Sequence, residues 1–373
     1  MYRIGFVIEQ VLGHVTYAKN LQTYVPLDSS IEAFWSLPIE PEKGLLAQLP
    51  NWSVQAGIQA RQMVGKIQQE TTLDALFFHT QTTAVFSQKW LKRIPGIISL
   101  DATPLQYDSF GEYYNHTTKS SWLENLKWRF TRRNISLAKH IVAWSAWTKQ
   151  GLIDGYGVPA KKITVIPPGV NLEEWHNSES SDQVIPNEPV RILFVGAELE
   201  RKGGQLLLEV YRRLLALTYK TMPEADAESL SVELHMVTKD DVVAEPGVHI
   251  YNDMKPNSTQ LKELFYRCHI FCLPSYGDFL PMVLSEAGAA GMPCVTTNIA
   301  AIPEIVKDGY SGYLVSPGDA NQLEAALQKL VTNPLLRQKM GRNARKLVAN
   351  NFNAQQNAEK LLNLLKREIK KAA

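Results

Sequence analysis

Cysteine is scarce in this chain of 373 residues, which has only Cys268, Cys272 and Cys294. The number is odd, no two of them form a C-x-x-C pair, and no neighbouring histidines complete a zinc-ligand pattern. This excludes a disulfide-rich fold and favours a reducing, cytoplasmic setting. We expect neither a metal site nor a bound cofactor.

Long apolar runs are also absent. The two longest uncharged runs, 44–60 and 287–303, contain proline and glycine and fall short of the roughly 20 apolar residues of a membrane span. The apolar run at the start of the chain ends at Glu9, too early for a secretory signal. We expect no segment that crosses a membrane.

No charge of either sign dominates. The chain has 39 basic and 37 acidic residues, a net charge of +2, so its overall balance gives no reason to expect a nucleic-acid partner. Hydrophobic residues make up 45% and charged residues 20%, which is typical of a soluble globular protein. At roughly 150 residues per domain, the length predicts two domains.

Short apolar runs alternate with helical stretches throughout, which predicts an α/β fold with parallel sheets. Residues 176–189 are polar, lack apolar periodicity and end in two prolines, as in an exposed linker. We predict a Rossmann-like domain at 1–175, a linker at 176–189, a second Rossmann-like domain at 190–352 and a terminal helix at 353–373 that packs back on the first domain. Ligands bind beyond the carboxyl ends of parallel strands, so two such domains would face each other across a cleft.

The most informative stretch is 271–306, FCLPSYGDFLPMVLSEAGAAGMPCVTTNIAAIPEIV. A strand leads into a loop with Asp278, and Glu286 follows on a helix. Helix-start amides near Met282, Val283 and Leu284 suit an anionic phosphate, and carboxylates suit sugar hydroxyls. Together these groups suit a nucleotide sugar.

This stretch resembles the retaining glycosyltransferases of family 4, whose architecture of two Rossmann-like domains is called GT-B. The resemblance implies that 1–175 is the acceptor domain and 190–352 the donor domain. The likeness includes the Ala-Gly-Met-Pro-Cys-Val run at 290–295, Pro303–Val306 and Gly312–Val315. The family's E-x7-E motif implies that Asp278 contacts the donor sugar and Glu286 the ribose. The chain departs from that motif with Asp278 in place of glutamate and Pro281 in place of glycine. Residues 144–171, Trp-Ser-Ala-Trp-Thr through Pro-Pro-Gly-Val-Asn, extend the likeness.

A second constellation follows the strand at 191–195. Gly196 opens a turn, and Lys202 heads a helix where it could neutralise a diphosphate leaving group. The family places an Arg and a Lys here. Lys202 matches the lysine, but Ala197 occupies the arginine position, and either Arg201 compensates or it is a solvated residue of the helix start.

In the first domain, Gly13 resembles the glycine loop that family members hold against donor and acceptor. His14 follows it, and His79 ends another strand; both are acceptor-side candidates. Asp101 stands where the family often has a histidine near the reacting carbon. Its carboxylate could bond sugar hydroxyls or receive the acceptor proton, or it could cap the following turn.

Two basic amphipathic stretches are candidates for contact with a membrane. Lys119–Lys139 has six basic residues against Glu124, with Leu123, Leu126, Phe130, Leu137 and Ile141 near one helical face. Such a helix can lie on an anionic membrane, although a first-domain helix with a solvated basic face is favoured. Residues 359–371 also have a leucine stripe with lysines around it, and packing of this stripe in the core is the better explanation.

The resemblance implies a retaining hexosyltransferase that moves a sugar from a UDP- or GDP-sugar to a hydroxyl acceptor. No D-x-D motif stands at the donor site, so we expect catalysis without a metal, with Lys202 and helix amides stabilising the leaving diphosphate. An inactive nucleotide-sugar-binding partner and an epimerase of the same fold stay open. The acceptor, whether glycan, lipid or small metabolite, is not predicted.

Overall fold

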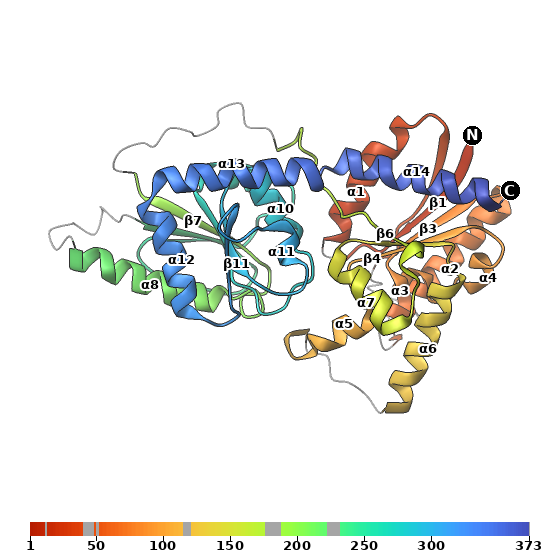
Figure 1. Cartoon of the computed structure of the whole chain (residues 1–373), viewed down its shortest axis with the longest axis horizontal. Coiled ribbons are helices and arrows are strands. Elements are labelled where there is room, and N and C mark those ends of the chain that lie inside the picture. The colour runs from red at the N-terminus through yellow and green to blue at the C-terminus, as the bar shows by residue number, and fades with distance from the viewer. Residues whose placement is uncertain are drawn as a thin grey trace. The chain divides into compact units, whose positions relative to one another are not determined.

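The computed structural model describes residues 1–11, 13–39, 48–49, 52–114, 121–175, 188–221 and 232–372. The chain divides into two units, and each is a parallel six-stranded sheet with helices (Figure 1). The first unit comprises Met1–Gly169 and Ala354–Ala373, and the second comprises Val170–Asn353. Two parallel α/β sheets were predicted, and this prediction is confirmed. Residues 170–175 belong to the second unit rather than to the first, where we expected them.

The first sheet has the strand order β2-β1-β3-β4-β5-β6. Its strands are β1 (Tyr2–Ile8), β2 (Ile31–Ser36), β3 (Ala75–His79), β4 (Gly96–Leu100), β5 (His140–Ala143) and β6 (Ile163–Val165). The helices of this unit are α1 (His14–Tyr24), α2 (Trp52–Glu70), α3 (Gln81–Ala84), α4 (Gln88–Leu91), α5 (Pro104–Ser109), α6 (Ser121–Leu137), α7 (Ala146–Tyr156) and α14 (Ala354–Ala372). The central strands β3 and β4 are buried along their whole length, as the continuous apolar runs predict.

The second sheet has the order β12-β11-β10-β7-β8-β9. Its strands are β7 (Val190–Val195), β8 (Val232–Val237), β9 (Val248–Tyr251), β10 (Ile270–Leu273), β11 (Cys294–Thr297) and β12 (Gly312–Val315). Its helices are α8 (Gly204–Thr221), α9 (Thr259–Arg267), α10 (Met282–Ala289), α11 (Ile302–Ile305), α12 (Ala320–Thr332) and α13 (Pro334–Asn351). The three cysteines are buried and unpaired.

Helix α14 lies against α1 in the first unit (Figure 1). Its buried stripe includes Leu361, Leu362 and Leu365, and Lys366 bonds the Asp28 carboxylate at 2.5 Å. Helix α14 therefore packs in the same unit as the first strand and helix of the chain. Residues 176–187 of the expected linker lie outside the described residues.

Strand β2 is missing from the sequence prediction. It is an edge strand that carries Glu32, and only its two end residues are buried, so it lacks the continuous apolar run that marks the other strands of this sheet. No helix among the described residues is long and apolar enough to span a membrane.

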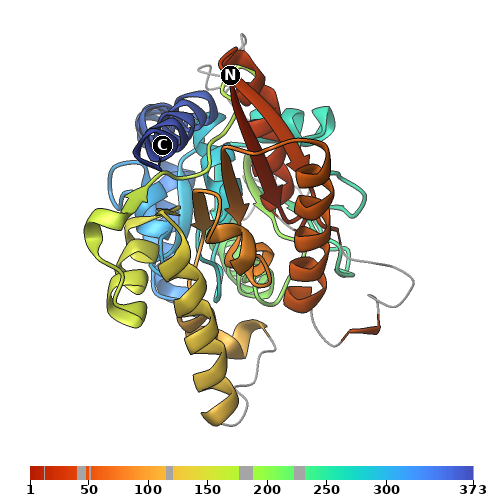
Figure 2. The ribbon, with the colours of Figure 1, turned by 90° about the vertical axis from the view of Figure 1, so that its right-hand side faces the viewer.

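Helix α6 extends away from the rest of the first unit (Figure 2). Trp122 is 66% exposed and Leu126 is 54% exposed, whereas Trp128 donates to the Gly155 carbonyl at 2.9 Å. Ile141, which we expected near the helical face, lies instead in β5, because the helix ends at Leu137. Lys119 lies outside the described residues.

Candidate functional site

The strand order reverses between β7 and β10 in the second sheet. The chain leaves β7 towards β8 and β9 and later returns to the other side of β7 with β10. Connections after β7 and β10 therefore leave in opposite directions at the carboxyl ends of the two strands, which is where parallel sheets bind ligands. The first connection carries Gly196, Arg201 and Lys202, and the second carries Asp278.

Lys202 and Asp278 meet at this point. The Lys202 Nζ atom donates to both Asp278 oxygens, at 2.8 and 2.7 Å, and both side chains are largely buried. The Ser275 hydroxyl donates to Asp278 Oδ2 at 3.0 Å, which fixes the carboxylate further. The residues that we predicted from two separate motifs thus form one ion pair.

The backbone of the two connections is tied together as well. Gly203 has a φ of 76°, and a Cβ atom there would lie 2.0 Å from the Pro274 carbonyl oxygen, so only glycine fits. The Tyr276 amide donates to the Arg201 carbonyl at 2.9 Å. Gly196 also lies close to Lys202, because a Cβ on Gly196 would contact the Lys202 side chain at 3.0 Å.

Arg201 holds this loop rather than a ligand. Its guanidinium donates to both Glu198 oxygens, at 3.0 and 2.6 Å, and to the Gly277 carbonyl at 2.6 Å. Only 8% of the residue is exposed. Sequence analysis left open whether Arg201 replaces the arginine missing at Ala197. These contacts favour a positioning residue and leave Lys202 as the cation better placed for a diphosphate.

Helix α10 begins at Met282, four positions after Asp278, and supplies two amides. Pro281 is its N-cap residue, and the Leu284 amide already donates to the Pro281 carbonyl at 3.1 Å. The first amides of a helix have no intrahelical acceptor, which leaves those of Met282 and Val283 for an anion. Sequence analysis had included the Leu284 amide, and this part was wrong.

Glu286 lies one turn further along α10 and is partly buried. Burial raises the pKa of its carboxyl to about 7, although Lys262 acts in the opposite direction. A carboxyl group with this pKa is half protonated near neutral pH, and either form can accept a hydrogen bond from a ribose hydroxyl.

A second cluster lies in the first unit, where the strand order reverses between β1 and β3. His14, the first residue of α1, contacts two carboxylates: Nδ1 lies 3.3 Å from Glu9 Oε1, and Nε2 lies 3.6 Å from Asp101 Oδ2. Burial lowers the pKa of His14, but Asp101 and Glu9 more than offset this effect and raise it to about 10. His14 is therefore a cation at neutral pH.

Aromatic rings enclose this cation. The His14 ring meets His79 edge to face at 4.6 Å and Trp144 at 5.6 Å, and Tyr17 contacts both His79 and Trp144. The Trp144 ring stacks on His79 at 4.5 Å. Burial, and then the charge of His14, lowers the pKa of His79, so this buried histidine is neutral. The two acceptor-side candidates, His14 and His79, are thus in contact.

Glu9 is the residue that sequence analysis missed. It is 3% exposed, and its carboxylate accepts from the Thr80 hydroxyl at 2.6 Å and from the Trp52 indole at 2.7 Å. Its position as the first residue after a buried strand was a usable signal. Gly13 is the N-cap residue of α1 with a φ of −65°, an angle that any residue adopts. Its backbone conformation therefore does not require glycine.

Asp101 follows β4, and its Oδ1 atom accepts from the Ala102 amide at 2.9 Å, while Oδ2 faces His14. Asp101 therefore caps the following turn with one carboxylate oxygen and takes part in the His14 cluster with the other. Asp101 belongs to the first unit, whereas Lys202 and Asp278 belong to the second. The three predicted catalytic residues therefore fall into two groups, each described within its own unit.

Comparison with known proteins agrees with this division. A model of the Glycosyltransferase Family 4 matches residues 38–174, and one of the Glycosyl transferases group 1 matches residues 245–347. The chain belongs to the family 4, group 1 glycosyltransferases. Together the two matches include Asp101 and His79 in the first unit and Asp278 and Glu286 in the second.

Two curated relatives illustrate the likeness. The putative colanic acid biosynthesis glycosyltransferase WcaL of Salmonella typhimurium is 31% identical over 229 residues, which are 58% of this chain and 53% of the relative. The D-inositol 3-phosphate glycosyltransferase of Thermobifida fusca is 23% identical over 218 residues, 56% of this chain and 50% of the relative. The chain thus matches about half the length of these curated relatives.

Solved structures share the GT-B fold over the whole chain. Sucrose-phosphate synthase from Thermosynechococcus elongatus superposes with a TM-score of 0.73 at 15% identity and covers 100% of both chains. Anabaena HepE in complex with UDP and glucose superposes with a TM-score of 0.70 at 15% identity, covering 98% of this chain and 100% of HepE. At this identity the likeness shows the fold alone.

The cluster around His14 predicts a specific dependence of stability on pH. His14 ordinarily loses its proton near pH 6.5 but holds it to about pH 10 in the folded protein. Between these values the folded state binds a proton that the unfolded chain has released, so the free energy of unfolding should fall as pH rises. Thermal unfolding of the wild type and His14→Asn across this range measures the effect.

We expect the wild type to lose more stability than His14→Asn over that range. Glu9→Gln removes one of the two carboxylates and should move the loss to lower pH. Parallel pH profiles for the wild type and His14→Asn would contradict a cationic His14. An NMR titration of the His14 ring gives the same answer directly.

Proposed function

We propose that this chain transfers a hexose from a nucleotide diphosphate sugar, UDP- or GDP-linked, to a hydroxyl acceptor. The observation that carries the proposal is the Lys202–Asp278 pair at the reversal point of the second sheet, beside the start of α10. A cation and helix amides suit a diphosphate, and carboxylates suit hydroxyls. The HepE structures with UDP, with UDP and glucose, and with UDP-glucose support this ligand class.

In this proposal, the amides of Met282 and Val283 and the Nζ atom of Lys202 hold the diphosphate. Glu286 accepts from the ribose hydroxyls, and Asp278 accepts from hydroxyls of the sugar. The charges of Arg201 and Glu198 offset each other, and so do those of Lys202 and Asp278. A diphosphate would therefore draw Lys202 partly away from Asp278 and free that carboxylate for the sugar.

The transfer step needs stabilisation of the leaving diphosphate and removal of the acceptor proton. Lys202 and the helix amides supply the first without a metal ion. We propose that the configuration at the anomeric carbon is retained and that the leaving phosphate takes the acceptor proton. In this proposal Asp101 acts near the reacting carbon, Gly13 approaches the donor, and the cationic His14 with His79 belongs to the acceptor side on the first unit.

Nucleotide binding tests the donor site. Calorimetric titration with UDP, GDP and ADP, first without metal and then with magnesium, should show that one nucleotide binds without metal. Glu286→Ala should weaken that nucleotide about 10- to 100-fold, because charge-assisted hydrogen bonds contribute about 1.5–3 kcal/mol. Glu263→Ala, which removes an exposed carboxylate from α9 of the same unit, is the matched control and should bind like the wild type.

The proposal fails if no nucleotide binds or if Glu286→Ala behaves like Glu263→Ala. Incubation with the sugar of the nucleotide that binds then separates the functions. Transfer or slow hydrolysis that falls about 100- to 1,000-fold in Lys202→Ala supports the transferase. Binding without any turnover indicates an inactive partner, which Ala197 and Pro281 would favour, and a changed sugar configuration indicates an epimerase.

We further propose that the first unit contacts an anionic membrane through α6. Trp122, Leu126 and Phe130 recur every four residues, and they are 66%, 54% and 36% exposed. Such spacing places them along one side of the helix, and Lys127, Arg129, Arg132 and Arg133 surround them. Apolar side chains among basic ones suit the surface of an anionic bilayer.

Vesicle binding tests this contact. The double variant Trp122→Ser/Leu126→Ser should pellet with phosphatidylglycerol vesicles at least about tenfold less than the wild type, because two large apolar side chains no longer enter the bilayer. Val243→Ser/Leu335→Ser removes two comparably exposed apolar side chains from the second unit and should leave binding unchanged. A wild type that does not bind, or equal losses in the two double variants, would contradict the contact.

A further inference from the structure

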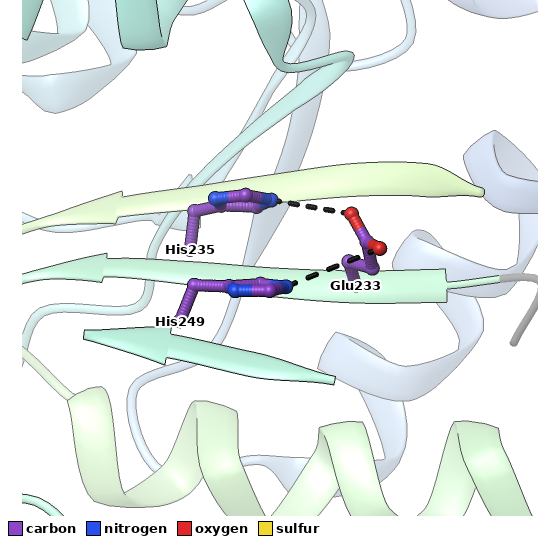
Figure 3. A group of neighbouring side chains, drawn as sticks. All are labelled: Glu233, His235 and His249. Carbon is purple, nitrogen blue, oxygen red and sulfur yellow. Dashed lines mark hydrogen bonds and ion pairs between the residues drawn. The ribbon is translucent and has the colours of Figure 1, made fainter. Parts of the chain in front are cut away.

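Three side chains outside the candidate donor site converge on one face of the second sheet (Figure 3). Glu233 and His235 lie two residues apart on β8, so their side chains share a face. His235 is paired with His249 on the neighbouring strand β9. The three residues come from two strands and form no linear motif, so the sequence pattern alone does not reveal them.

The polar atoms of the three side chains point toward one another. His235 Nε2 lies 3.4 Å from Glu233 Oε2, His249 Nε2 lies 3.9 Å from Glu233 Oε1, and one ligand atom from each residue falls within 4.8 Å of the others. In a tetrahedral zinc site with bonds of about 2.1 Å, neighbouring ligand atoms are about 3.4 Å apart. The cluster is therefore close to the size that a zinc ion requires.

Neighbouring groups orient two of these side chains. The Tyr251 hydroxyl bonds His235 Nδ1 at 2.9 Å, which turns Nε2 toward the cluster. The Nε atom of Arg191 donates to Glu233 Oε2 at 3.3 Å. Such outer contacts to a ring nitrogen and a carboxylate are typical of metal sites. The positive charge of Arg191 opposes a bound cation. The NH1 atom of Arg191, however, pairs with the Glu188 carboxylate and donates to the Arg267 carbonyl.

His249 gives the cluster an open side. It lies on the edge strand β9, and its side chain is 47% exposed, whereas His235 is buried. The two imidazole rings are stacked with centroids 4.6 Å apart, so the rings must tilt toward each other to share one ion. His249 has the room to do so.

We propose that Glu233, His235 and His249 bind one divalent transition-metal ion, with Zn²⁺ as the best match and water completing its coordination. Two imidazoles and one carboxylate suit this ion, and the bound ion would join the edge strand β9 to β8. The site is separate from the donor site, because Glu233 lies near the start of β8, whereas the donor residues follow the carboxyl ends of β7 and β10. It therefore does not depend on the proposed transfer reaction.

Metal titration of the tag-free protein tests this site. Calorimetric titration with Zn²⁺ should give one ion per chain, and Co²⁺ should give the visible absorption of a tetrahedral ion with nitrogen and oxygen ligands. His249→Ala and Glu233→Gln should each weaken Zn²⁺ binding by at least about tenfold and remove the Co²⁺ absorption. Asp253→Asn, which neutralises an exposed carboxylate just beyond β9, should match the wild type.

Three results would overturn the proposal. They are the absence of saturable Zn²⁺ binding in the wild type, Zn²⁺ binding that neither His249→Ala nor Glu233→Gln weakens, and an equal loss in Asp253→Asn. Circular dichroism of each variant shows whether the chain is folded. His249 is the safer position for substitution, because it is half exposed on an edge strand.

Discussion

The reversal of strand order within each sheet is the constraint on which both candidate sites depend. In the second sheet it separates the connections after β7 and β10, which brings Lys202 against Asp278. In the first sheet it does the same for β1 and β3, where Glu9 and His14 meet His79 and Thr80. Side chains at these points are held by a backbone that the sheet fixes, so little entropy is lost when they bind a ligand.

Charge balance is the second shared feature. Arg201 with Glu198, Lys202 with Asp278, and His14 with Glu9 and Asp101 form two close pairs and a triad, and the cation of each is largely buried. An unpaired buried charge would cost several kcal/mol, so each cation needs its carboxylate in the absence of a ligand. In the proposed donor site, a diphosphate would therefore compete with Asp278 for Lys202, and the strength of that ion pair would become part of the donor affinity.

Sequence reasoning predicted the two parallel sheets and most strands, because buried parallel strands are continuous apolar runs bounded by turn residues. It missed β2, an edge strand whose Glu32 interrupts the apolar pattern. Motif spacing and the family resemblance predicted Lys202, Asp278 and Glu286 as site residues, and the structure pairs Lys202 with Asp278. Sequence reasoning overlooked Glu9, although the position of that residue after a buried strand was a usable signal. It could not find the bond from Arg201 to the Gly277 carbonyl, since partners 76 residues apart are joined only by the fold. The same holds for Glu233, His235 and His249.

The central claim is that the reversal point of the second sheet binds the nucleotide sugar, and a crystal structure with the bound nucleoside diphosphate tests it most directly. We predict the diphosphate within hydrogen-bond distance of Lys202 Nζ and of the Met282 and Val283 amides, with the ribose hydroxyls on Glu286. A nucleotide bound elsewhere, with the Lys202–Asp278 pair intact and its diphosphate out of reach of α10, would contradict the account.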